Sequence, residues 1–286
     1  MRKQKSTTKK PGRQLRVASV QLRTGPDLAA NLARIEQVLA ECAGRGVSIA
    51  AFPECVVTGY NHDTIKRTTA AELRAAERRL ADACRRYRID ALIGTPWRTG
   101  GKVENAALII DRSGRVRARQ LKLHLVGQDE EWGCTPGRMP SPVFRVAGVP
   151  CAVFICHDSR YPELARLPVL AGAKVLFYLS HEASLRKEGK MGPYRAQVQA
   201  RAVENGVYVV HANAPADPDF RGSHGQSRIV APDGSIMHEA SIIGEEVLIA
   251  TLDLAEATAE NGLRSLEPGP LADWWRAGLR LVKVLQ

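Results

Sequence analysis

Two segments of the sequence place reactive side chains directly after strand-like apolar runs. Residues 47–52 lead into Glu54, and residues 150–155 lead into Cys156. In α/β proteins, functional side chains gather at the carboxyl ends of strands. Lys122 lies in a basic stretch between the two segments. A thiol, a carboxylate and an ammonium group would together form a plausible set for covalent catalysis.

Cys156 is the stronger of two candidate nucleophiles. It follows an apolar run and precedes a predicted helix, so we expect it in a tight strand-to-helix turn. The N–H groups at a helix N-terminus favour the thiolate and could hold a developing oxyanion. A buried structural cysteine is the alternative on local context alone. Cys55 is weaker because no turn into a helix follows it.

A cysteine nucleophile needs a base. His157 is adjacent to Cys156 and is expected to point away from it. Other histidines could serve, although nothing in their spacing selects one: His124, His181, His211 and His224. Glu54 is the stronger candidate, because burial at a strand end raises the pKa of a carboxyl group into the range useful for proton transfer. An ordinary strand-end glutamate is the alternative.

Lys122 follows an alternating strand-like segment, residues 117–121. Alternation puts Ala118, Gln120 and Lys122 on one face and Arg117, Arg119 and Leu121 on the other. An ammonium group next to Cys156 would stabilise both the thiolate and the tetrahedral oxyanion. One more solvated charge on a basic strand is the alternative.

Composition narrows the class of protein. The 286 residues are 44% hydrophobic and 25% charged, as in a soluble globular protein, and no apolar run is long enough to span a membrane. Seven positive charges in the first 16 residues account for much of the net charge of +11. We interpret residues 1–13 as a disordered solubilising tail. Nucleic-acid binding through this tail is the less favoured reading, since no nucleic-acid motif accompanies it.

The six cysteines form no CxxC pair, which argues against zinc-ribbon and thioredoxin-like sites. A reducing cytoplasm fits unpaired cysteines of this kind.

Strand-like and helix-like segments alternate in both halves of the chain. This pattern predicts an α/β protein with mixed sheets and helices outside them. Predicted strands are 15–21, 47–52, 89–95, 174–180, 207–212 and 246–253, with hairpins at 104–111/115–121, 143–146/150–155 and 227–231/235–239. Predicted helices are 31–43, 70–87, 161–171 and 193–205, and residues 122–137 are expected to be irregular.

Three segments resemble the signature motifs of the nitrilase (carbon–nitrogen hydrolase) superfamily in order and separation. They are Phe52-Pro53-Glu54, Lys122-Leu123-His124-Leu125 and Cys156-His157-Asp158-Ser159-Arg160-Tyr161-Pro162-Glu163. The resemblance covers roughly residues 14–265. It implies a four-layer αββα sandwich with two mixed β-sheets and no metal or organic cofactor. It also implies a homodimer or higher homo-oligomer, in which the arm of residues 266–286 reaches the partner.

The resemblance also implies site roles. Glu54 would be the general base, Lys122 the oxyanion stabiliser and Cys156 the nucleophile. A second glutamate would position Lys122 and the substrate. Glu130 and Glu131 compete for this role, and counting back from Pro136-Gly137 favours Glu130.

The Cys156-His157-Asp158 sequence is nearer the Cys-Tyr-Asp type of amidases and carbamoylases than the Cys-Trp-Glu of true nitrilases, although His157 departs from the common tyrosine. We therefore expect hydrolysis of a small amide or N-carbamoyl compound through a cysteine acyl-enzyme, releasing ammonia or an amine. Nitrile hydrolysis and a non-catalytic binding protein of the same fold are the alternatives. The residues expected to contact the substrate are His157, His181, Glu182, Ala183 and Asn213. For the last four of these, capping of a loop is the alternative role.

Overall fold

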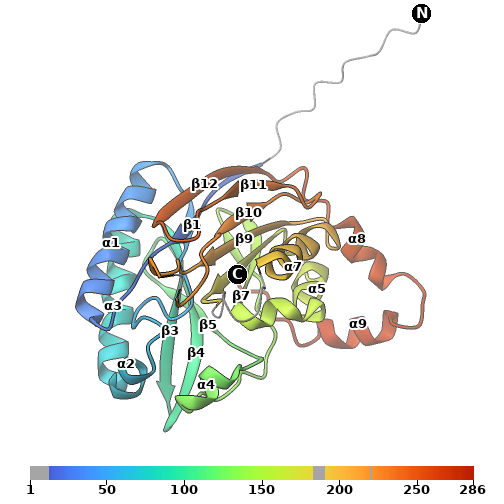
Figure 1. Cartoon of the computed structure of the whole chain (residues 1–286). Coiled ribbons are helices and arrows are strands. Elements are labelled where there is room, and N and C mark those ends of the chain that lie inside the picture. The colour runs from blue at the N-terminus through green and yellow to red at the C-terminus, as the bar shows by residue number, and fades with distance from the viewer. Residues whose placement is uncertain (1–12, 183–190, 220) are drawn as a thin grey trace, which may run out of the picture.

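Two six-stranded β-sheets pack face to face, and helices cover the outer face of each (Figure 1). The computed structural model describes residues 13–182, 191–219 and 221–286. Ala183 and all but the last residue of the predicted N-terminal tail lie outside the described residues. The predicted four-layer αββα sandwich is confirmed.

The first sheet has the order β12-β1-β2-β3-β4-β5. Its strands are β1 (Gln14–Gln21), β2 (Ile49–Ala51), β3 (Asp90–Thr99), β4 (Lys102–Ile110), β5 (Val116–Leu121) and β12 (Glu246–Asp253). Strands β1, β2 and β3 run parallel, while β12, β4 and β5 pair antiparallel to their neighbours. Helices α1 (Leu28–Gly44) and α3 (Ala70–Tyr87) cover its outer face, and the short α2 (His62–Arg67) lies between them in sequence.

The second sheet has the order β11-β10-β9-β8-β7-β6. Its strands are β6 (Phe144–Val146), β7 (Val149–Ile155), β8 (Val175–Ser180), β9 (Tyr208–Asn213), β10 (Arg228–Val230) and β11 (Ile236–Glu239). Here β7, β8 and β9 are the parallel strands. Helices α5 (Pro162–Leu170) and α7 (Met191–Val203) cover the outer face of this sheet (Figure 1).

Alternation along the strands divides the apolar residues among three layers of core. In β1, Leu15 and Val17 belong to the cluster between the sheets, whereas Ala18 and Val20 pack toward α1 and α3. The outer face of the second sheet packs against α5 and α7. Because successive side chains of a strand point to opposite faces, each sheet is buried on both sides.

The carboxyl ends of the parallel strands of both sheets meet at one place. The backbone N–H of Glu54, after β2, faces the carbonyl oxygen of Ser180 at the end of β8, 3.4 Å away. Cys156 follows β7 directly, and Lys122 follows β5 directly. The fold therefore gathers residues that are about 100 positions apart in the sequence.

Local details differ from the sequence predictions in several places, among them the short helix α2, which was not predicted. Cys156–Arg160 form a 3₁₀ turn, η1, so that α5 begins only at Pro162, whose missing N–H suits the first position of a helix. Residues expected to be irregular contain a short helix, α4 (Gly127–Glu131).

The C-terminal segment folds into α8 (Glu260–Leu263), η2 (Arg264–Leu266) and α9 (Ala272–Leu279). Its last residues return to their own chain, where Val143 pairs with Val284. None of the helices in the described part of the chain is long and apolar enough to cross a membrane.

Gly94 of β3 lies directly behind the turn that carries Glu54. A Cβ atom at this position would meet the carbonyl oxygen of Pro53 at 2.3 Å and the Cα atom of Glu54 at 2.7 Å. Both contacts are with backbone, which cannot rotate away. The absence of a side chain at Gly94 is therefore required for Glu54 to occupy its place.

We predict that Gly94→Ala lowers the free energy of unfolding by about 1–3 kcal/mol, the usual cost of overpacking. It should also reduce any activity that depends on Glu54. Thermal and chemical unfolding measure the first effect. Gly44→Ala is the matched control, because nothing lies within 4 Å of its added Cβ. Equal stability of the two variants would contradict the role assigned to Gly94.

Candidate active site

Cys156 lies in a tight, unusual turn at the end of β7. Its φ angle is +43°, in the left-handed region that residues with a side chain rarely adopt. Such backbone strain persists only where the surroundings impose it, and it is common at functional sites. Cys156 is still partly exposed, whereas Cys55, the other candidate, is fully buried. The structure therefore favours Cys156 as the accessible thiol.

Glu54 is almost fully buried, and both oxygens of its carboxylate are engaged. Oε1 accepts hydrogen bonds from Lys122 Nζ at 2.8 Å and from Asn105 Nδ2 at 2.7 Å. Oε2 accepts from the backbone N–H of His181 at 3.0 Å. The carboxylate is thus fixed by one residue from each of three elements or their ends: β4, β5 and β8.

Lys122 lies between two carboxylates, with no exposure of its side chain to solvent. Its Nζ atom is 2.8 Å from Glu54 and 2.7 Å from Asp129 Oδ2. Asp129 is fully buried as well, and its Oδ1 accepts a 2.7 Å hydrogen bond from the Tyr60 hydroxyl. One cation is therefore shared by two anions inside the protein.

Asp129, rather than the predicted Glu130, makes the contact with Lys122 in this structure. Asp129 Oδ2 also accepts the backbone N–H of Val126, a capping bond that turns this side chain inward at the start of α4. The two following residues on the short helix point outward. Glu130 is exposed, and Glu131 forms a surface ion pair with His62 at 3.0 Å.

Asp158 ties the turn of Cys156 to the segment after Lys122. This buried carboxylate accepts hydrogen bonds from the backbone N–H groups of Leu123 at 3.2 Å and His124 at 2.9 Å. The His124 ring also stacks on Tyr161, with centroids 3.5 Å apart. Two of the motifs are thus locked together through backbone contacts.

The expected substrate contacts fall into different environments. His181 is partly exposed and stacks on Tyr60, and His157 is also partly exposed. Glu182 and Asn213 are buried. The Asn213 amide is bonded to Glu182, Ser223 and Gly225, which corresponds to the loop-capping alternative. Ala183 lies outside the described residues.

Three residues that contact Glu54, Lys122 or each other were not predicted from the sequence: Asn105, Tyr60 and Asp129. Asn105 lies within an apolar strand, where a buried amide is expensive unless it is bonded. A single amide inside the apolar run 103–110 therefore indicates a residue with a buried hydrogen-bond partner. Nothing in the sequence around Tyr60 singles it out.

The pKa values follow from this environment. Burial raises the pKa of Glu54 above the usual glutamate range; Lys122 opposes this effect and Asp129 adds to it. Burial would lower the pKa of Lys122, but Glu54, Cys156 and Asp129 raise it well above the usual value. Burial and Glu54 raise the pKa of the Cys156 thiol, whereas Lys122 lowers it. Near neutral pH, Lys122 is therefore charged and Cys156 rests as a thiol.

A resting thiol beside a carboxylate of raised pKa suits proton transfer to that carboxylate. A fixed ammonium group beside the sulfur suits stabilisation of an oxyanion. His181 stays neutral, because burial and Lys122 lower its pKa to about 4. Within the described residues, no group of three His, Cys, Asp or Glu side chains is arranged to hold a metal ion.

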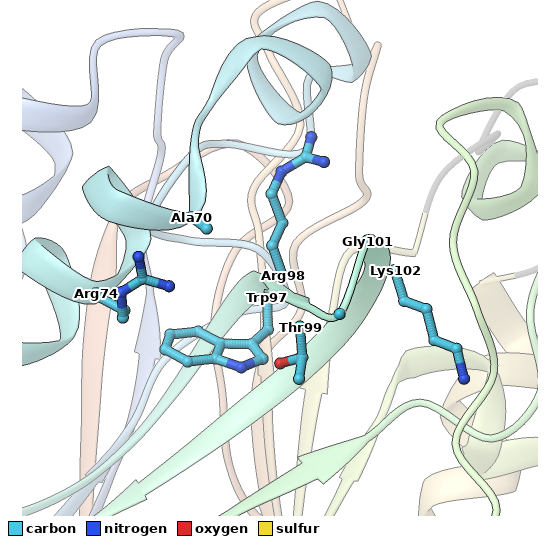
Figure 2. Close-up of a pocket in the computed structure, with 8 residues that line it drawn as sticks. Ala70, Arg74, Trp97, Arg98, Thr99, Gly101 and Lys102 are labelled. Atoms are coloured by element: carbon cyan, nitrogen blue, oxygen red, sulfur yellow. The ribbon is translucent and has the colours of Figure 1, made fainter.

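A separate surface pocket of about 390 Å³ lies at the start of α3 and the turn between β3 and β4 (Figure 2). Its lining residues are Ala70, Arg74, Trp97, Arg98, Thr99, Gly100, Gly101 and Lys102. Figure 2 shows the Trp97 indole between Arg74 and Thr99. These residues include no thiol, carboxylate or imidazole, so the pocket lacks the groups that are assembled around Cys156.

Comparison with known proteins identifies relatives along most of the chain. The family model for carbon–nitrogen hydrolases matches residues 16–260. A hydrolase in the pqqF 5′ region of Pseudomonas protegens is 31% identical over 84% of this chain and 83% of its own length. A deaminated glutathione amidase of Synechocystis sp. is 30% identical, over 78% of this chain and 86% of its own.

Solved structures show the same fold. An amidase from Nesterenkonia sp. superposes with a TM-score of 0.78 at 26% identity, over 89% of this chain and 97% of that one. A mutant of the amidase from Nesterenkonia sp. AN1 has a TM-score of 0.77 at 26% identity, over 85% of this chain and 92% of that one. It carries the acetamide moiety of fluoroacetamide covalently on its active-site cysteine.

We predict that Asp129→Asn lowers kcat/KM by about 100-fold, or ~2.7 kcal/mol, since it removes one of the two charges that hold Lys122. Glu130→Gln, its neighbour on the same helix, should stay within about twofold of the parent, because an exposed side chain away from the site has little effect. Steady-state kinetics on one amide compare the two. The reverse order of effects would restore Glu130 as the positioning residue.

Proposed function

The chain belongs to the carbon–nitrogen hydrolase family, and from this premise we propose that Cys156, Glu54 and Lys122 hydrolyse a small amide or N-carbamoyl compound. The observation that carries the proposal is the buried contact of Lys122 with Glu54, two groups that both act electrostatically on the partly exposed thiol of Cys156. A nucleophile, a base and an oxyanion stabiliser are the three parts that amide hydrolysis through an acyl-enzyme requires.

In the first half of the reaction, Glu54 takes the proton of Cys156 and the sulfur attacks the carbonyl carbon. The oxyanion is held by the ammonium group of Lys122 and the backbone N–H of His157. Glu54 then gives its proton to the departing nitrogen, the C–N bond breaks, and a thioester remains. Loss of one oxyanion donor would cost on the order of 3 kcal/mol.

In the second half, Glu54 removes a proton from water, which attacks the thioester carbonyl. The C–S bond breaks, the acid leaves, and the proton returns to Cys156. Both halves use the same base and the same oxyanion donors, so water is the one co-reactant that the proposal needs.

Two observations support an amide over a nitrile. Asp158 occupies the place where true nitrilases commonly carry glutamate, and it is committed to the backbone after Lys122. The relatives include a deaminated glutathione amidase and an omega-amidase from Danio rerio. A non-catalytic binding protein is disfavoured because the nucleophile, base and ammonium group are all retained.

We predict that a panel of small amides and N-carbamoyl compounds forms a covalent acyl adduct on Cys156, visible by intact-mass analysis. Nitriles should react much more slowly. Cys156→Ala should lose the adduct and turnover. Cys55→Ala, a change at the buried neighbouring thiol, should keep the adduct. If Cys156→Ala still turns over substrate, Cys156 is not the nucleophile. If nitriles react faster than amides, the assignment to amide rather than nitrile hydrolysis is wrong.

We also propose a cytoplasmic homodimer or higher homo-oligomer. All six cysteines are free thiols, as expected in a reducing compartment. The C-terminal segment exposes large apolar side chains that a partner chain could cover: Leu271 at 60%, Trp274 at 53% and Leu281 at 52% exposure.

We predict that light scattering gives at least twice the chain mass of 31.2 kDa. Trp274→Glu should shift the protein toward the monomer, because a charge in an apolar interface is costly. Met237→Glu, at another exposed apolar residue, serves as the control. A parent protein that is monomeric at tens of micromolar would contradict the proposal.

A further inference from the structure

A second buried cluster of titratable groups lies beside Cys156 and shares no residue with the Glu54–Lys122–Asp129 group. Glu182 follows β8, His211 belongs to β9, and His224 lies between β9 and β10. The Nε2 atoms of the two histidines are 3.3 and 2.8 Å from the two oxygens of Glu182. All three side chains are essentially inaccessible to solvent.

Glu182 is a buried carboxylate with an imidazole on each of its two oxygens. His211 and His224 each turn the Nε2 atom toward one of these oxygens. Burial alone would raise the pKa of Glu182, but His211 and His224 hold it far below the usual range. Burial lowers the pKa of His211. Glu182 is therefore ionised near neutral pH.

Glu182 also fixes the loop that carries His224. Its backbone N–H donates to Asn213 Oδ1 at 3.0 Å, and the Asn213 amide nitrogen donates to the carbonyl oxygen of Gly225 at 2.7 Å. Ser223 donates its hydroxyl to the same Asn213 oxygen at 2.8 Å. The side chain and the backbone of Glu182 thus hold the same loop.

From His224 the contacts lead back to the turn of Cys156. The His224 ring packs against Tyr194 of α7, with centroids 5.3 Å apart. Tyr194 accepts a 2.7 Å hydrogen bond from Arg160, which lies in η1 with Cys156. A continuous set of contacts therefore joins the end of β8 to the nucleophile's own turn.

The negative charge of Glu182 also acts electrostatically on the Cys156 thiol. It adds to burial and Glu54 in raising the pKa of Cys156. Other charged or titratable groups around this cluster are Arg160 on η1, His181 after β8, Tyr194 on α7 and Arg228 on β10. Glu54 and Lys122 also act on the sulfur. Glu182 is thus one of two buried carboxylates that act on one thiol.

We propose that Glu182 is a positioning residue for the reaction: through His224 it holds Tyr194, which is bonded to Arg160 in the turn of Cys156. This role differs from the direct contact with substrate that the sequence led us to expect of Glu182. The inference rests on the proposed function, because it assigns Glu182 a part in the reaction of Cys156. It makes the cluster a determinant of thiol reactivity.

The test compares Glu182→Gln, which keeps size but removes the charge, with Glu239→Gln. Glu239 is a second carboxylate near Arg228 that contacts neither histidine. Alkylation of Cys156 by iodoacetamide is followed against pH by peptide mass spectrometry. We expect the midpoint of the profile to move to lower pH in Glu182→Gln, because a negative charge beside the thiol is lost, and to stay in Glu239→Gln.

Steady-state kinetics on one amide give the second readout. We expect kcat/KM to fall at least tenfold in Glu182→Gln and to stay within twofold of the parent in Glu239→Gln. An unchanged alkylation midpoint, or an unchanged kcat/KM, in Glu182→Gln would overturn the proposal.

If Glu182→Gln does not fold, His224→Leu tests the same path, because leucine presents no nitrogen to Glu182 and no ring to Tyr194. We expect kcat/KM for the same amide to fall at least tenfold in this variant. A kcat/KM equal to that of the parent would overturn the proposal. Alkylation requires no turnover, so a parent enzyme that hydrolyses no amide would refute the proposed function while the cluster is still tested.

Discussion

The contact on which the site depends is the ammonium group of Lys122, buried between the carboxylates of Glu54 and Asp129. Removing three charges from water is costly, and the arrangement is tolerable only when every oxygen and proton has a partner. Asn105, Tyr60 and the N–H of His181 supply the remaining hydrogen bonds. Two anions share one cation, so the group retains a net negative charge. This charge favours uptake of a proton by Glu54, which is the first step that the chemistry requires.

Rigid backbone holds this group of charges in place. Glu54 fits only because Gly94 behind it has no side chain, and the turn of Cys156 is tied to the segment after Lys122 by Asp158. Neither support touches a substrate in the proposed mechanism. Both act by fixing the distances among groups whose reactivity depends on them. The strained φ angle of Cys156 belongs to the same set of constraints.

The sequence was sufficient to single out Glu54, Lys122 and Cys156 as candidates. Glu54 and Cys156 each follow an apolar run, Lys122 follows an alternating strand, and the spacing of the three carried the family resemblance. The sequence was also sufficient for the four-layer sandwich. It did not show that Asp129 rather than Glu130 contacts Lys122, because one residue of register on a five-residue helix decides which carboxylate points inward. Nor did it show the contacts among Glu182, His211 and His224, which depend on how three loops and strands pack. Such contacts leave no periodic signal in a single sequence.

The division of the site between two sheets has a consequence for the maturing chain. Glu54 and Lys122 emerge from the ribosome with the first sheet, whereas Cys156 belongs to the second, and β12 completes the first sheet only near the end of synthesis. A chain in which only one sheet has formed holds either the base or the nucleophile, but not both. Enzymatic competence therefore arises only when the two sheets dock, a late event governed by contacts between distant parts of the chain. The rate at which activity appears during refolding would thus report the rate of sheet docking rather than the rate of strand formation.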